Sequence, residues 1–163
     1  MTYSSDLVAC FRDALAAITA PRFFRTERGF QGELLVQLSR RICLPDQAIL
    51  EQEYQKRQHE HGLTIRPDIV IHEPFDPTRF TDRTQGNLAV VELKLCATAA
   101  EAAQDFASLA TMIKVLHYPL GVFVNIRAAA TYAELVPAEV RGRVVAFAVD
   151  FVDGKTHVIE QRT

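Results

Sequence analysis

The stretch Asn87–Leu95, which reads NLAVVELKL, decides the fold of this 163-residue chain. Its apolar residues occupy both alternating faces around only two charges, Glu92 and Lys94. A strand that is apolar on both faces is typical of the centre of a sheet that is covered on both sides. We therefore predict a central β-strand at 87–95.

Further strands are predicted on either side of this stretch. Arg66–His72 contains the apolar run Ile69–Ile71, and Leu120–Ile126 reads LGVFVNI. Loose alternation of apolar and polar residues predicts a strand at Ala48–Lys56. Arg143–Phe151 and Lys155–Gln161 are predicted as the last two strands. Asp153-Gly154 separates the last two and is a hairpin turn signal.

Three helices complete the pattern. Apolar residues at helical spacing predict one over 7–18, with Ser4 or Ser5 as its N-cap, and another over 26–43. Thr98 and Glu101 form a capping-box pattern that opens a third helix, which ends before Pro119. The order predicts one α/β domain over 1–163, with a mixed central sheet flanked by helices and a C-terminal β-hairpin.

Composition and charge exclude several classes of protein. Eighteen Lys and Arg face twenty Asp and Glu, a net charge of −2 that argues against coating nucleic acid by bulk electrostatics. No apolar run reaches the roughly 18 residues of a membrane helix, so we expect no membrane partner. The three cysteines are scattered, which favours a reducing, cytoplasmic compartment over a disulfide framework.

Three charged residues stand inside two of the most apolar predicted strands. Glu92 and Lys94 are two apart and share a face of one strand, and Asp68 enters the other. An unpaired buried charge costs several kcal/mol, and a divalent metal would supply the compensation. Asp68 and Glu92 are the oxygen ligands that Mg²⁺ prefers, and Lys94 would position the attacking water.

Pro67-Asp68 followed by Glu92-x-Lys94 resembles the motif of the PD-(D/E)xK superfamily, the restriction-endonuclease-like nucleases. The resemblance covers about 26–126. It implies a restriction-endonuclease-like αβββαβ core and a nuclease that hydrolyses phosphodiester bonds with Mg²⁺ or Mn²⁺. DNA is the expected substrate, in repair, recombination or phage defence. Many members carry a glutamate on the preceding helix, and Glu33 stands where it would complete the metal site.

Other polar residues near this motif have plainer interpretations. Glu51 and Glu53 share a face of the predicted strand at 48–56. Two interpretations are open, a place in the wall of the same cleft and exposure to solvent at the sheet edge, and exposure is the expectation. Gln104 and Asp105 follow the Glu-x-Lys strand on a helix, where some superfamily members place an extra polar residue; here too surface exposure is expected. His72 is isolated and is expected to be satisfied or exposed.

Competing functions stay open. Glu92 and Lys94 would form a plain ion pair in a structural α/β subunit, and Asp68 after Pro67 would cap a turn. A nuclease fold without catalysis would serve as a nucleic-acid or protein interaction module. His59-Glu60-His61 offers two histidines without the spacing of a helical metal site, and is interpreted as a polar turn.

Contacts to phosphate would come from local basic groups. Arg22, Arg25 and Arg28 precede the second helix, and Arg79 and Arg83 lie in the long loop 73–86. Phosphate contacts position a nucleic acid without reading its sequence. A symmetric homodimer would be favoured for cutting both strands, because each chain carries one predicted site.

Overall fold

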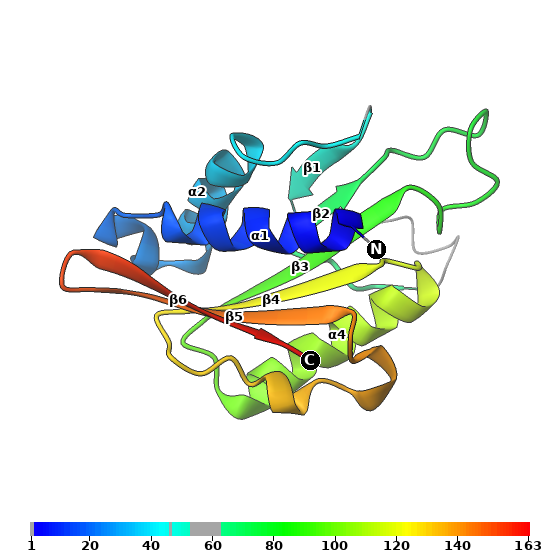
Figure 1. The fold of residues 1–163 in the computed structure, drawn as a ribbon. Coiled ribbons are helices and arrows are strands. Elements are labelled where there is room, and N and C mark those ends of the chain that lie inside the picture. The colour runs from blue at the N-terminus through cyan, green and yellow to red at the C-terminus, as the bar shows by residue number, and fades with distance from the viewer. Residues whose placement is uncertain (1, 46, 53–62) are drawn as a thin grey trace.

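The computed structural model describes residues 2–45, 47–52 and 63–163. A six-stranded mixed sheet separates two layers of helices, as Figure 1 shows, which confirms the predicted α/β architecture. The strands lie side by side in chain order: β1 (Ile49–Gln52), β2 (Ile69–His72), β3 (Asn87–Leu95), β4 (Leu120–Ile126), β5 (Val144–Val152) and β6 (Lys155–Arg162).

The central position predicted for 87–95 is confirmed. β3 pairs antiparallel with β2 and parallel with β4, and its predicted bounds agree with the structure. β4 and β5 are also parallel, whereas β1 and β6 are antiparallel edge strands. The carboxyl ends of β3, β4 and β5 therefore meet at one end of the sheet, toward the left of Figure 1.

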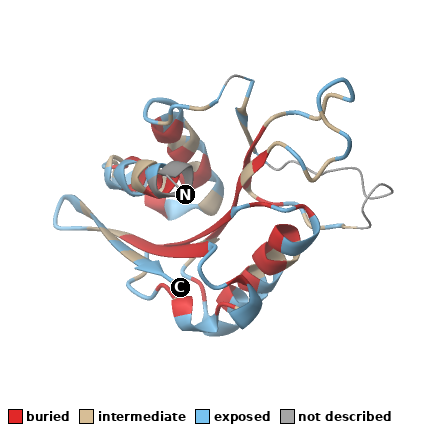
Figure 2. Ribbon diagram, turned by 45° about the vertical axis from the view of Figure 1, so that its right-hand side comes forward, coloured by how far each residue is buried: buried red, intermediate tan, exposed pale blue. Residues whose placement is uncertain are grey.

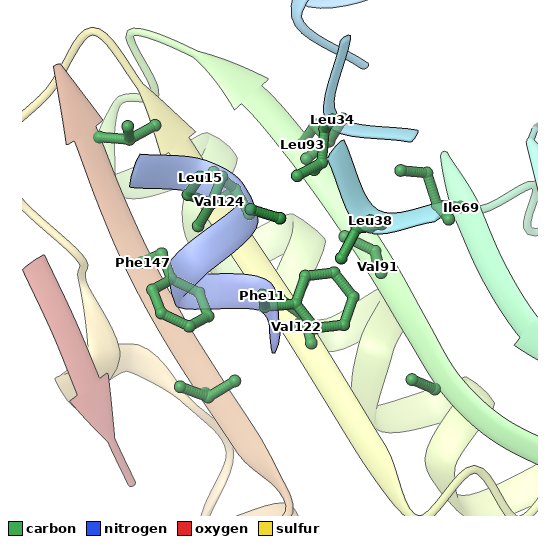
Figure 3. Packing of buried hydrophobic residues seen from close by; sticks show 14 of the residues in the cluster. Phe11, Leu15, Leu34, Leu38, Ile69, Val91, Leu93, Val122, Val124 and Phe147 are labelled. Atoms are coloured by element: carbon green, nitrogen blue, oxygen red, sulfur yellow. The ribbon is translucent and has the colours of Figure 1, made fainter. Parts of the chain in front are cut away.

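Two helices cover one face of the sheet, α1 (Thr2–Ala16) and α2 (Glu27–Ser39). The short helix η1 (Pro21–Arg25) joins them. Figure 3 shows side chains from both helices packed on strands β2 to β5, among them Phe11 and Leu34. Because α1 begins at Thr2, the predicted caps Ser4 and Ser5 lie inside the helix instead.

The opposite face is covered by α4 (Ala99–Val115) and the short helices η2 (Ala133–Leu135) and η3 (Ala138–Val140). The predicted capping box is confirmed, since Thr98 Oγ1 accepts from Glu101 N and Glu101 Oε2 accepts from Thr98 N. Gly121 lets α4 approach β4 closely, because a Cβ there would lie 3.0 Å from Ile113 Cδ1. Because helices cover both faces of the sheet, the central strands are the most continuously buried part of the molecule (Figure 2).

The predicted C-terminal hairpin is also confirmed. Asp153 and Gly154 both have positive φ, at 52° and 76°, as a two-residue type I′ turn requires. β6 returns against α1, where Arg12 Nη1 lies 3.4 Å from Glu160 Oε2. In the described ranges, no helix is both long and apolar enough to cross a membrane.

Candidate active site

The sheet brings Asp68 and Glu92 together. Ile69 pairs with Val91 across the antiparallel strands, so the register places Asp68 opposite Glu92. Opposite residues point to the same face, and Val70 and Val90 show that this is the α4 face. The two carboxyl groups are hydrogen-bonded to each other, with Glu92 as the proton donor.

Main-chain contacts fix Asp68 in this position. Its Oδ2 accepts a hydrogen bond from Leu93 N at 2.7 Å, and its main-chain oxygen accepts one from Gln31 Nε2 at 2.7 Å. Gln31 is buried in α2. Asp68 is thus held by both neighbouring elements, β3 and α2, and the interpretation as a simple turn cap is not needed to explain it.

Lys94 and Asp105 complete the cluster. Lys94 lies two residues beyond Glu92 on the same face, and Asp105 reaches toward both from α4. Asp105 is half-buried, and its Oδ2 is enclosed without a hydrogen-bond partner among the described residues. The predicted surface exposure of Asp105 is therefore wrong, whereas Gln104 beside it is exposed as expected.

Burial and crowding of like charges change the acidity of all three carboxyl groups. Burial, followed by the Asp68 and Asp105 charges, raises the pKa of Glu92 to about 9. Burial also raises the pKa of Asp105 to about 6, opposed by the Lys94 ammonium. The pKa of Asp68 is raised by burial against the hydrogen bond from Leu93. The cluster lacks enough positive charge for its carboxylates.

A glutamate on α2 reaches this cluster, and it is Glu27. Its Oε2 accepts from Leu95 N at 3.1 Å, and its charge raises the pKa of Asp68 and Asp105. Gln31 marks the side of α2 that contacts Asp68. Glu33 comes two residues later, about 200° around the helix, so it lies on another side. Its Oε1 accepts a hydrogen bond from Gln37 Nε2 at 2.6 Å. The structure therefore brings Glu27, in place of Glu33, to Asp68.

The donor set fits a divalent cation held mainly by substrate and solvent. In residues 2–45, 47–52 and 63–163, no three Asp, Glu, His or Cys side chains enclose one point closely enough to ligate an ion. Mg²⁺, however, commonly takes only one or two protein carboxylates and keeps several waters. The hydrogen-bonded Asp68–Glu92 pair and the unpartnered Asp105 oxygen match that pattern, since a cation would relieve both.

The contacts bear on the Glu92–Lys94 ion pair and on the surroundings of Glu51 and His72. No ion pair within 4.0 Å joins Glu92 to Lys94, because Glu92 bonds to Asp68. Glu51 Oε2 lies 2.6 Å from Nε2 of the buried His72, so His72 is satisfied and Glu51 has a partner within the sheet. Glu53 and the His59-Glu60-His61 stretch lie outside the described residues.

Asn125 shapes the end of the sheet beside Lys94, its partner in the β3–β4 register. Its Oδ1 accepts from Ala97 N and its Nδ2 donates to Ala130 O, both at 2.9 Å. The side chain thereby ties together the two loops that leave β3 and β4. The contacts give Asn125 a structural role, one that its position inside an apolar strand did not disclose.

Comparison with protein-family models, with curated proteins and with solved structures gives no match for this chain. The cluster combines three carboxyl groups, one ammonium group and a fourth carboxylate from α2 at the carboxyl end of β3. Ligand sites of α/β sheets are commonly located at this end of the strands.

Proposed function

We propose that the chain is a divalent-metal-dependent nuclease of the PD-(D/E)xK type that hydrolyses phosphodiester bonds, with DNA as the expected substrate. One observation carries this proposal: Asp68 and Glu92 share a hydrogen bond opposite each other, with Lys94 on the same face. The strand order β1-β2-β3-β4, with only β3 and β4 parallel, agrees with the αβββαβ core that the motif implies.

Each residue would have a distinct role. Asp68 and Glu92 would hold Mg²⁺ or Mn²⁺, which supplies charge stabilisation at the phosphate and lowers the pKa of water. Lys94 would orient the attacking water and offset negative charge on the phosphate. The motif implies that Glu33 completes the metal site, and we assign this role to Glu27 instead. Glu27 accepts a hydrogen bond from Leu95 N and adds negative charge beside Asp68.

Asp105 is the group placed to accept the proton from water. A pKa of about 6 leaves it mostly ionised at pH 7 yet basic enough to take a proton. As the water oxygen bonds to phosphorus, one phosphorus–oxygen ester bond breaks. The water proton passes to Asp105, and the leaving sugar oxygen takes a proton from solvent.

The direct test is cleavage of supercoiled plasmid, linear duplex and branched DNA with Mg²⁺ or Mn²⁺. We expect Asp68→Asn and Lys94→Met to lower the rate at least 100-fold. Lys114→Met is the matched control, because Lys114 is an exposed lysine of α4 that pairs with Glu139 at 3.6 Å. Equal activity of wild type, D68N and K94M would reject this site.

Calorimetry separates the proposal from an interaction module without catalysis. Wild type titrated with Mn²⁺ should bind it, and D68N should not. DNA binding by a protein that neither takes up Mn²⁺ nor cleaves would identify the interaction module instead.

A further inference from the structure

A cavity lies at the same end of the sheet as the Asp68–Glu92 cluster, on the face that α1 and α2 cover. It has a volume of about 310 Å³ and is located between η1 and the ends of β4 and β5. Its lining residues are Pro21, Phe24, Arg25, Arg127, Asp150 and Phe151. The volume falls within the range of small-ligand clefts.

The cavity is lined by two arginines, neither of which forms an ion pair with a carboxylate in the part of the chain that the structure describes. Arg25 and Arg127 are exposed, and no salt bridge within 4.0 Å joins either guanidinium to a carboxylate of the described residues. Among the described residues that line the cavity, Asp150 alone is acidic, and its Oδ1 accepts a hydrogen bond from Phe151 N at 2.8 Å. The excess of positive charge favours an anionic ligand, and guanidinium groups match phosphate geometry.

Aromatic rings form the wall beside these cations. Phe24 and Phe151 pack with ring centroids 5.8 Å apart and planes inclined by 33°. Phe24 is buried, whereas Phe151 is half-buried. A cationic site walled by aromatic rings suits a nucleotide, because phosphate meets the guanidinium groups while sugar or base contacts the ring.

Both arginines are tied to the segment that leaves the Glu-x-Lys strand. Arg25 precedes Glu27 by two residues, and Glu27 Oε2 accepts from Leu95 N. Arg127 follows Ile126, whose oxygen accepts from Cys96 N at 2.8 Å. Lys94 pairs with Asn125, so the Cα atoms of Lys94 and Arg127 are separated by roughly 8 Å at ordinary strand dimensions.

We propose that this cavity is a phosphate subsite, in which Arg25 and Arg127 bind a phosphodiester of the nucleic-acid strand within a few nucleotides of the bond that is cleaved. This inference rests on the proposed nuclease function and identifies where the substrate strand runs. The net charge of −2 argued against binding of nucleic acid by the protein surface as a whole. Two guanidinium groups in one cavity would instead attract phosphate locally.

Binding measured without metal tests the subsite apart from cleavage. A fluorescein-labelled 12-nucleotide oligothymidylate is titrated with protein in EDTA at several salt concentrations, followed by anisotropy. We expect Arg25→Ala with Arg127→Gly to weaken binding at least 10-fold. The slope of log affinity against log salt should fall by roughly 1. Glycine suits position 127, where φ is 57°, so the variant retains its fold.

The matched control removes the same charge from the far end of the same strands. Arg143 precedes β5, and Arg162 ends β6 opposite Val145, about 20 Å along the strand from Phe151. Arg143→Ala with Arg162→Ala should change affinity less than 2-fold. Equal losses in both double variants would reduce the effect to bulk charge and overturn the subsite. Unchanged binding in the first variant, or no binding by wild type, would also overturn it.

Two further outcomes distinguish the subsite from the function on which it rests. Selective loss of binding in the first variant, with no cleavage by wild type under any metal, supports the subsite and rejects the nuclease. Cleavage that both double variants retain supports the nuclease and rejects the subsite. Competition by thymidine monophosphate as strongly as by the oligonucleotide would identify a mononucleotide site and overturn strand binding.

Discussion

Glu92 donates its carboxyl proton to Asp68 on the α4 face of the sheet, beside an Asp105 oxygen that has no hydrogen-bond partner among the described residues. This single hydrogen bond makes the metal-free site a proton-holding site.

Replacing Glu92 with glutamine should stabilise the metal-free protein. The pKa of Glu92 rises from 4.5 to about 9 on folding, so the folded state holds more protons than the unfolded state between these values. The free energy of unfolding of wild type therefore falls as pH rises through this window. Glutamine does not titrate, so the gain should be near zero at pH 4.5 and on the order of 2–3 kcal/mol at pH 7.

Urea denaturation in EDTA at pH 4.5, 6, 7 and 8.5 measures this difference. In a separate assay at the same pH values, with Mg²⁺ or Mn²⁺ in place of EDTA, the Glu92→Gln variant should not cleave DNA. A gain independent of pH would show that Glu92 is not the group that holds the proton.

Glu27 and Glu33 should differ in their effect on activity. Glu27 contacts Leu95 N and lies within electrostatic reach of Asp68, whereas Glu33 bonds to Gln37 on another side of α2. We expect Glu27→Gln to lower the cleavage rate at least 10-fold and Glu33→Gln to change it less than 2-fold. Rates at saturating Mn²⁺ compare the two, and the opposite ranking would restore Glu33 to the site.

Asp105→Asn should remove activity and leave the fold intact. The carboxylate is partly desolvated and its Oδ2 has no partner in the described part of the chain, so its loss should not destabilise the protein. Its raised pKa adds to the loss of stability as pH rises from about 4 to 6. The asparagine variant should lack this contribution and keep that of Glu92. Gln104→Ala, at the exposed neighbour, is the control for both cleavage and unfolding.

Gln31→Leu should destabilise the protein through Asp68. The amide of Gln31 is the side-chain donor to the main-chain oxygen of Asp68, and its removal leaves that oxygen without this bond. The expected cost is about 1–3 kcal/mol, measured by urea denaturation at pH 7. Gln31→Glu, which keeps the length but lacks the donor when ionised, should behave similarly, and no loss in either variant would contradict the contact.

The bounds of the strands were easier to predict from the sequence than which helix residues face the sheet. An apolar run with few charges has one stable place in a sheet, so Asn87–Leu95 and Leu120–Ile126 were predicted with their observed bounds. The opposition of Asp68 and Glu92 depends on register, which the motif alone only implied. Which glutamate of α2 reaches the sheet depends on rotation of the helix, set by packing.

A signal for Glu27 was nevertheless present in the sequence. Glu27, Gln31, Leu34 and Leu38 are spaced by four, three and four residues, and the last three are buried. They therefore share the face that packs on β2 and β3. The Glu51–His72 contact and the tie made by Asn125 had no such signal, because they depend on loops and strand pairings that join distant parts of the chain.

β3 is divided along its length, and the division has a consequence for protein engineering. Its first five residues are packed between two apolar clusters, whereas the charged residues Glu92 and Lys94 come near its end. Mutational scanning should therefore report expression level at 87–91 and turnover at 92–94. A variant in which Asp68, Glu92 and Asp105 are all replaced by their amides should be inactive and should unfold at a higher temperature than its parent. A different reactive group can then be introduced into this scaffold.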